Sequence, residues 1–354
     1  MTPILITGLP WARDRLPGMT APAAAPLSNM RRLIVKFVSF PEFCGTLSET
    51  ATARERLVRT RGLCLSAAMT QPVHVIGATG RSGLALCGSL LHDAIPVVAV
   101  VRDPAKWAAD GLPGQVARAD LTDAAALRAA LDQATRVVSC AHARHAPAII
   151  AAAPPASRLV LLGSTRKYTR WPDDHGNGVL AGEAALLGSD RSGVMLHPTM
   201  IYGAQGEDNV QRLAALLRRL PLIPLPNGGR FLVQPIHQSD VTRCIRAALD
   251  RAWDGPASLV IAGPAPVQYA DFVRAVAAAA GQRTPRIVAF PPAPLFLAAR
   301  LTRYIAALPT VGPAEVRRLM EDKAFDIAPM RSLLGVDPLP LAKGLALTFR
   351  LPHQ

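Results

Sequence analysis

A glycine-rich segment, GATGRSG, which begins at Gly77, has the residue types and spacing that hold a phosphate group. It follows a short β-branched apolar run and precedes a stretch of helical periodicity, so the sequence predicts strand, tight turn and helix. In that order Gly77 permits the sharp turn, Gly80 lets the backbone approach a pyrophosphate, and Gly83 lets the helix pack closely on the sheet. The helix N-terminus offers free N–H groups, and Thr79 and Ser82 add hydroxyls. We therefore predict a dinucleotide-binding site.

The end of the next strand indicates which dinucleotide is held. The apolar run PVVAVV at 96–101 arrives at the distance of a βαβ unit, and Arg102 follows it. A carboxylate at this place holds the ribose 2′-hydroxyl of NAD, whereas an arginine suits the 2′-phosphate of NADP. Arg102, together with Arg81 from the turn, favours NADP. Asp103 comes next, so NAD remains the alternative cofactor. The alternative role of Arg102 is that of a solvated arginine at a strand end.

The composition is that of a globular protein. Half of the 354 residues are hydrophobic, which allows one large or two ordinary domains with an aliphatic core. The formal net charge is +14, but the basic residues are scattered and do not alternate with aromatic ones, so we expect no nucleic-acid partner. The five cysteines are too far apart for paired thiols or zinc ligands and predict reduced, mostly buried side chains in a cytoplasmic protein.

From Val73 onward, segments of strand length alternate with segments of helical periodicity. This alternation predicts an α/β fold with a doubly wound parallel sheet. NGGR at 227–230 is typical of a hairpin turn that leads into a strand at 231–236. Beyond the first two strands and their helix, we expect strands at 115–119, 136–140, 158–162, 193–196 and 259–262, and helices at 122–133, 207–218, 240–252 and 269–281.

Several segments together resemble a known family. GATGRSG, the strand-end arginine, ADL at 119–121, LLGST at 161–165, HPTMIYG at 197–203 and VQPIHQSDV at 233–241 are similar, in that order, to extended and atypical short-chain dehydrogenase/reductases. The NmrA-like and nucleoside-diphosphate-sugar epimerase groups are the most similar. The resemblance covers about residues 72–340 and implies a Rossmann-type cofactor domain with a smaller part that faces the substrate.

The resemblance also implies where the ligands lie. In such folds they bind beyond the carboxyl ends of the strands, where Ala141, Ser164 and Pro198 would fall. Pro198 and Thr199 would line the nicotinamide end of the cofactor, and Asp120, beside Leu121, would accept from the adenine amine. Asp120 has an alternative role, which is to cap the next helix together with Asp123.

The resemblance and the residues give three parts. Residues 1–70 are an N-terminal appendage without sustained periodicity, either disordered or preceding the true start, since Met69 stands just before the first strand. A targeting or membrane-surface role for its basic, apolar piece is the alternative. Residues 71–205 form the NAD(P)-binding domain, and 206–354 form the smaller C-terminal part. Within it the apolar stretch 285–308 is too interrupted to span a membrane, which leaves a docking helix or a membrane-surface contact.

The catalytic pair of the family is missing. Its reductases and epimerases use a Tyr as acid/base, with a Lys four residues later that lowers the pKa of the Tyr, and a Ser on the preceding strand end. Ser164 fits that Ser. Aligning Glu183 with the family's helix Glu places His175 at the Tyr and Val179 at the Lys. The usual Tyr/Lys chemistry is therefore not supported.

Substitutes for the pair exist. Tyr168, beside Lys167, and His175 are candidate proton carriers, with Ser164 as hydrogen-bond donor to the substrate. The alternatives are an aromatic lid residue for Tyr168, an exposed loop residue for His175 and a small strand-end residue for Ser164. CAHARH at 140–145 places two histidines beside a thiol but lacks a third ligand, so we predict no metal.

Two functions remain open. The first is an NADP-dependent reductase or epimerase-like oxidoreductase that acts on a small-molecule substrate. The second is a non-catalytic, NmrA-like regulator that senses the dinucleotide and contacts a protein partner. The missing Tyr and Lys favour the second function, whereas Ser164 and a substrate-sized C-terminal part favour the first. The sequence does not determine the oligomeric state.

Overall fold

The computed structural model describes residues 71–204, 209–220, 222–294 and 313–349. The predicted appendage and most of the apolar stretch 285–308 lie outside these residues. All described residues belong to one contact-defined unit, Arg59–Gln354, and the predicted boundary at 205 stays a prediction. None of the described helices combines the length and apolar character that a membrane span needs.

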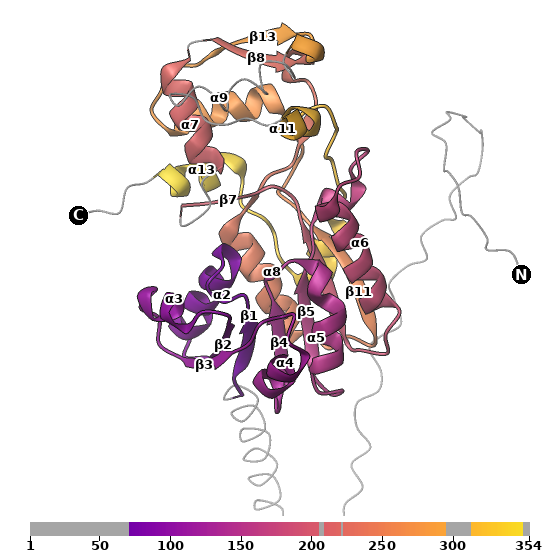
Figure 1. Ribbon diagram of the computed structural model, residues 1–354. Helices are drawn as coiled ribbons and strands as arrows, with labels where there is room; N and C mark the ends of the chain where they lie inside the picture. The colour runs from indigo at the N-terminus through magenta and orange to yellow at the C-terminus, as the bar shows by residue number, and fades with distance from the viewer. Residues whose placement is uncertain (1–70, 205–208, 221, 295–312, 350–354) are drawn as a thin grey trace, which may run out of the picture. The chain divides into compact units, whose positions relative to one another are not determined.

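The fold is built on a seven-stranded sheet in the order β11-β6-β5-β4-β1-β2-β3, and all of its strand pairs are parallel (Figure 1). This confirms the doubly wound α/β prediction. β2 and β3 follow β1 on one side of the sheet, and β4 pairs with β1 on the other side. The strand order therefore reverses between β1 and β4, and such folds bind ligands beyond the carboxyl ends of the two strands at this switch point. The strands are β1 Val73–Ile76, β2 Val97–Val101, β3 Gln115–Arg118, β4 Arg136–Ser139, β5 Arg158–Leu162, β6 Gly193–Pro198 and β11 Pro256–Ile261.

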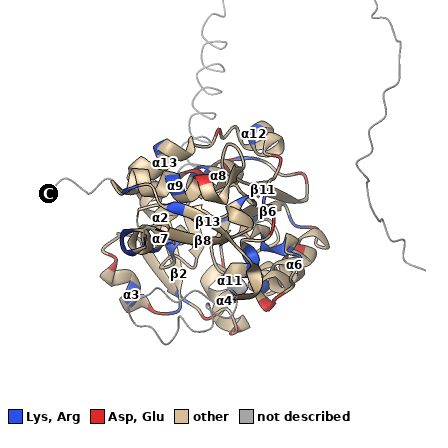
Figure 2. Cartoon of the chain, turned by 90° about the horizontal axis from the view of Figure 1, so that it is seen from above, with Lys and Arg blue, Asp and Glu red and all other residues tan. Residues whose placement is uncertain are grey.

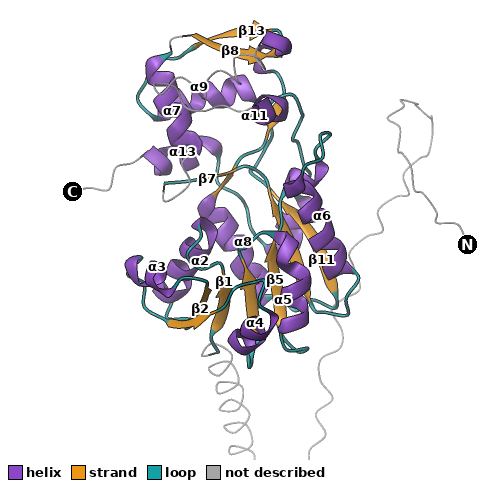
Figure 3. Cartoon of the chain, viewed as in Figure 1, coloured by secondary structure: helices purple, strands orange, loops and turns teal. Residues whose placement is uncertain are grey.

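Helices cover both faces of the sheet because its central strands are apolar on both sides (Figure 3). Val73 and Val75 of β1 belong to one apolar cluster and Ile76 to the other. The first cluster includes α2 Arg81–His92, α3 Pro104–Ala109, α8 Gln238–Asp250 and α12 Ala328–Leu334. The second includes α4 Ala124–Leu131, α5 Ala146–Ala152 and α6 Asp174–Leu187.

A third apolar cluster forms the core of the C-terminal part. Its elements are α7 Asn209–Arg219, α9 Tyr269–Ala279, α13 Leu341–Phe349 and the parallel pair β8 Leu222–Pro226 and β13 Arg286–Phe290. Short strands β7 Ile201–Tyr202 and β10 Ile236–His237 pair with each other, and α11 spans Pro313–Arg318. Lys and Arg positions are spread over several helices rather than gathered on one (Figure 2).

The predicted hairpin at 227–230 is wrong. Asn227–Gly229 form a 3-10 turn in which all three residues have positive φ, between 51° and 73°. This turn redirects the chain, so the next strand, β9 Leu232–Val233, pairs antiparallel with β12 Val267–Gln268 and not with β8. The same glycine-rich pattern serves hairpins and redirecting turns, and only the long-range pairing decides between them.

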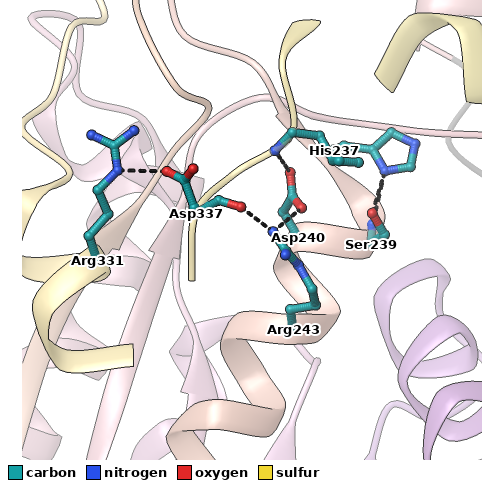
Figure 4. A network of polar contacts seen from close by, with 7 residues as sticks. His237, Ser239, Asp240, Arg243, Arg331 and Asp337 are labelled. Carbon is teal, nitrogen blue, oxygen red and sulfur yellow. Dashed lines mark hydrogen bonds and ion pairs between the residues drawn. The ribbon is translucent and has the colours of Figure 1, made fainter. Parts of the chain in front are cut away.

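Polar contacts tie the segment after α12 to α8 (Figure 4). The fully buried Asp240 carboxylate accepts from the backbone N–H of Leu339 at 2.9 Å and pairs with Arg243 at 2.8 Å. Arg243 also donates to the carbonyl of Asp337, whose carboxylate pairs with Arg331 of α12. A buried carboxylate is tolerated when it is paired and hydrogen-bonded in this way, and the contacts hold the segment after α12 against the sheet layer.

Candidate functional site

The turn between β1 and α2 has the geometry that the three glycines predict. Gly77 has φ +74°, in the left-handed region that favours glycine. A Cβ at Gly83 would lie 2.1 Å from the Gly77 carbonyl oxygen, so only glycine lets the helix approach this closely. Gly80 is the exposed N-cap of α2, with extended backbone and its N–H bonded to that same carbonyl at 2.9 Å. The turn therefore presents the start of α2 to solvent without an intervening side chain.

Arg102 is exposed directly after β2. The neighbouring Asp103 caps α3, accepting from the N–H of Ala105 at 3.0 Å, so its carboxylate is engaged in the protein's own structure. This arrangement leaves the arginine as the residue of the pair whose charge is available to a ligand at the strand end. Arg81, the second predicted cation, is exposed at the first position of α2.

Asp120 does not cap the next helix. Its carboxylate accepts from the backbone N–H and the hydroxyl of Thr122, at 2.9 and 2.7 Å, and these hydrogen bonds lower the pKa of Asp120, with Arg102 contributing. Asp123 alone caps α4, accepting from two backbone N–H groups. Leu121 packs against the second apolar cluster. The adenine role of Asp120 stays a prediction.

The other predicted cofactor residues lie at the same edge of the sheet. The backbone N of Ala141, beyond β4, lies 3.2 Å from the Cβ position at Gly77, so the two strand ends nearly touch. Pro198 ends β6, and Thr199 is buried, with its hydroxyl donating to the carbonyl of Gln234. Ser82 contacts Gln238 of α8 at 3.3 Å, and Thr79 is half-buried in the turn. Parallel strands thus gather these residues from distant parts of the sequence.

A cavity of about 490 Å³ lies beyond the ends of β5 and β6. Its volume is within the range of small-molecule sites, about 300–1,000 Å³. Two of the three predicted catalytic residues, Ser164 and Tyr168, line it, as does Thr199. The C-terminal part supplies the opposite wall, including Asn209, Arg212, Tyr269 and the segment 318–325.

The third catalytic candidate, His175, is not among the residues that line this cavity. It lies in α6, where its ring packs edge-on against His142, with centroids 4.3 Å apart. Burial lowers the pKa of both rings, and that of His142 to about 4. Val179, at the position of the family's Lys, is buried in the core. Neither position that the resemblance aligned with the Tyr/Lys pair contributes to the cavity wall.

Ser164 is the N-cap of a 3-10 turn, η2 Thr165–Tyr168, and Tyr168 is its last residue. This turn forms one edge of the cavity. The Ser164 hydroxyl oxygen accepts from the N–H of Arg166 at 3.1 Å, which leaves its own hydrogen free to donate. Tyr168 is 55% exposed, and its ring packs beside Phe325, with centroids 5.6 Å apart. The ammonium of Lys167 lies 4.8 Å from the centre of the Tyr168 ring.

A buried polar network behind η2 was not predicted from the sequence. The Glu183 carboxylate pairs with the Lys167 ammonium, accepts from the Ser258 hydroxyl and lies 3.2 Å from Nε2 of His197. The Lys167 and Glu183 side chains are only 6% and 13% exposed, and His197 is fully buried. One carboxylate therefore joins η2, α6, β6 and β11.

The hydrogen bonds define the form of His197. Its Nδ1 accepts from the backbone N–H of Ser164 at 3.2 Å, so the ring proton lies on Nε2, which faces Glu183 and Ser258. Burial, with the nearby Lys167 charge, lowers the pKa of His197 to about 4. The ring is therefore neutral at pH 7 and fixes the backbone of a cavity residue.

Two further predictions concerned the cysteine thiols and a metal site. Cys87, Cys140 and Cys244 are free thiols, and burial raises the pKa of Cys87 and Cys244 to about 12. Such thiols are inert at neutral pH. Within the described ranges, no group of three or more His, Cys, Asp or Glu side chains is arranged to hold a metal ion.

Comparison with known proteins agrees with this geometry. Residues 77–185 match a family described as NAD(P)H-binding, and this segment contains the glycine turn, Arg102 and Ser164. The match supports the predicted binding of a nicotinamide dinucleotide and does not distinguish NAD from NADP. No curated protein matches the sequence.

Solved structures share the fold. An NADPH-dependent quinone oxidoreductase from Escherichia coli, complexed with NADPH, is 20% identical with a TM-score of 0.61, and the alignment covers 78% of this chain and 100% of that one. The UDP-glucuronic acid 4-epimerase from Bacillus cereus is 16% identical with a TM-score of 0.60, covering 79% and 98%. MoeE5, in complex with UDP-glucose and NAD, is 23% identical with a TM-score of 0.59, covering 78% and 97%. At these identities the likeness shows a shared Rossmann-type fold.

Proposed function

We propose that the chain is an NADP-dependent oxidoreductase that reduces a carbonyl or quinone group of a small molecule held in the cavity beside η2. The observation that carries this proposal is the cavity itself, because Ser164, Tyr168 and Thr199 line it just beyond the carboxyl ends of β5 and β6. Ligands of such folds bind at this edge of the sheet. Arg102, with Asp103 engaged at α3, supports NADP as the cofactor.

In the proposed reaction, some residues bind the cofactor and others act on the substrate. The start of α2 and its bare Gly80 hold the pyrophosphate, and Arg102 holds the 2′-phosphate. Bound NADPH supplies a hydride. Ser164 donates its free hydroxyl hydrogen to the substrate oxygen, and the Tyr168 hydroxyl gives the proton that completes reduction. Lys167 stabilises the position of the Tyr168 ring and is itself held by Glu183.

One observation supports the second function, that of a non-catalytic regulator. The positions aligned with the family's Tyr and Lys are His175, which contacts His142, and Val179, which is buried in the core. A chain that binds the dinucleotide without turning it over, and that alters a protein contact with cofactor state, has no need of that pair.

Turnover separates the two functions. With NADPH and a panel of carbonyls, quinones and sugar nucleotides, we expect loss of the reduced-nicotinamide absorbance, and Tyr168→Phe should lower kcat by about a hundredfold or more because a proton donor in the transition state contributes that much. Ser164→Ala should also lower kcat, and neither change should weaken NADPH binding. Tyr269→Phe removes a hydroxyl from another tyrosine of the same cavity and is the matched control.

If Tyr168→Phe and Tyr269→Phe behave alike, Tyr168 is not the proton donor. If the chain binds NADPH tightly but turns over no substrate in the panel, the regulator is the better account, and partners whose affinity changes with the cofactor should be sought.

A further inference from the structure

The wall of the cavity combines two kinds of surface. One is apolar and includes Met200, Leu213, Val233 and Phe325. The other is cationic and comprises Arg166, Arg170, Arg212, Arg318 and Lys323, against two acidic residues, Glu321 and Asp322. A site of this kind suits a ligand with an apolar body and a negative charge.

The two acidic residues are engaged in hydrogen bonds within the protein itself. The buried Glu321 carboxylate accepts from the Thr169 hydroxyl at 2.8 Å and from the N–H of Arg170 at 2.5 Å. Asp322 accepts from the N–H of Leu232 at 2.8 Å. Both carboxylates thus fix the loops that form the wall.

The cations crowd one another. Lys323 donates to the carbonyl of Arg318 at 2.8 Å. Burial lowers the pKa of Lys323; the Glu321 charge opposes this shift, and the charges of Arg318 and Arg166 add to it. Arg166 pairs with Asp173 through one terminal nitrogen, but its buried Nε–H donates to no acceptor in the part of the chain that the structure describes. A bound anion would relieve this repulsion, and partial exclusion of water strengthens the attraction.

We propose that the substrate of this cavity is an organic anion: an aromatic or aliphatic carbonyl compound that carries a carboxylate, sulfonate or phosphate group. The inference rests on the proposed function for the reacting carbonyl, and it adds the charged group and the apolar body. The apolar wall holds the body, while Arg170 and Arg318 hold the anion.

A pair of dyes tests the charge requirement directly. 8-Anilinonaphthalene-1-sulfonate and N-phenyl-1-naphthylamine share one apolar skeleton and differ in the sulfonate. In fluorescence titrations of the full chain, we expect the sulfonate to bind at least about tenfold more tightly, since a charge-assisted contact contributes about 1.5–3 kcal/mol and each 1.4 kcal/mol is tenfold. The double variant Arg170→Gln/Arg318→Gln should abolish this preference and leave binding of the neutral dye unchanged.

Arg128→Gln is the matched control, because Arg128 is an exposed arginine of α4 that does not line the cavity. Equal affinities for the two dyes in the unmodified chain, or an equal loss in the control, would overturn the inference. NADPH is titrated in parallel without dye. A chain that binds NADPH and turns over neutral carbonyls but shows no sulfonate preference refutes the anionic substrate alone. A chain that shows the preference but neither binds nor oxidises NADPH refutes the proposed function and leaves the anion site in place.

Discussion

Replacing Gly83 with alanine is expected to destabilise the chain by about 3 kcal/mol or more and to abolish NADPH binding, because overpacking at a site that cannot relax reaches or exceeds that range. The added Cβ would lie 2.1 Å from the Gly77 carbonyl oxygen and 2.9 Å from the Ala78 Cα. Both are backbone atoms of the turn itself, so relief requires α2 to move away from β1. The measurement is urea unfolding together with a fluorescence titration of NADPH.

Gly88 provides the control within the same helix. Apart from the backbone of α2 itself and the two neighbouring residues, no atom of the described residues lies within 4 Å of a Cβ placed there. Gly88→Ala should therefore be neutral or stabilise by about 0.5–1 kcal/mol through helix propensity. A Gly83→Ala chain that is as stable as Gly88→Ala and binds NADPH normally would show that α2 does not depend on this close approach.

Glu183→Gln is expected to lower the free energy of unfolding by about 3 kcal/mol, since breaking a buried ion pair from one side leaves the other charge uncompensated. The glutamine keeps the shape of the side chain and its contacts to Ser258 and His197, so the loss isolates the missing charge opposite Lys167. The double variant Lys167→Met/Glu183→Gln should recover part of the loss, because no unpaired ammonium then remains. Chemical denaturation of the unmodified chain, Glu183→Gln, Lys167→Met and the double variant gives the coupling energy.

The exposed pair of Arg274 and Asp271 on α9 is the comparison for this cycle. Its side chains are 47% and 60% exposed, and Asp271→Asn should cost less than about 1 kcal/mol, as surface pairs do. If Glu183→Gln costs no more than Asp271→Asn, the network behind η2 does not hold the cavity edge in place.

Most of the central sheet could be predicted because the residues that mark each strand lie close together in the sequence. β1 begins at Val73 as predicted, β5 has its predicted bounds, and β2, β3 and β4 agree within one residue. β2 and β5 are mostly apolar runs between turn residues, whereas β3 is mostly exposed. The glycine turn could be predicted equally well, because the close contacts that require glycine at position 83 come from residues only a few positions away. The hairpin at 227–230 was wrong because pairing between β9 and β12 joins distant segments.

The buried network could not be read from local pattern. Lys167, Glu183, His197 and Ser258 come from four elements that only the strand order brings together, with β5, β6 and β11 adjacent in the sheet. One signal was present, the helix residue Glu183 that the family resemblance aligned. This signal does not indicate that Glu183 and His197 meet, because their contact depends on how α6 packs on the sheet. The resemblance likewise aligned His175 with a catalytic Tyr, whereas α6 places it against His142.

Titration with NADPH and NADH tests most directly the central claim, that the turn after β1 and the arginine after β2 bind NADP. In the unmodified chain NADPH should enhance nicotinamide fluorescence and bind more tightly than NADH, by roughly tenfold or more if Arg102 forms a charge-assisted contact with the 2′-phosphate. Arg102→Asp should reverse that preference, and Gly80→Val should abolish binding of both by placing a side chain where the pyrophosphate lies. Equal affinities for NADPH and NADH, unchanged in Arg102→Asp, would contradict the assignment of NADP, and absence of binding to either would contradict the dinucleotide site itself.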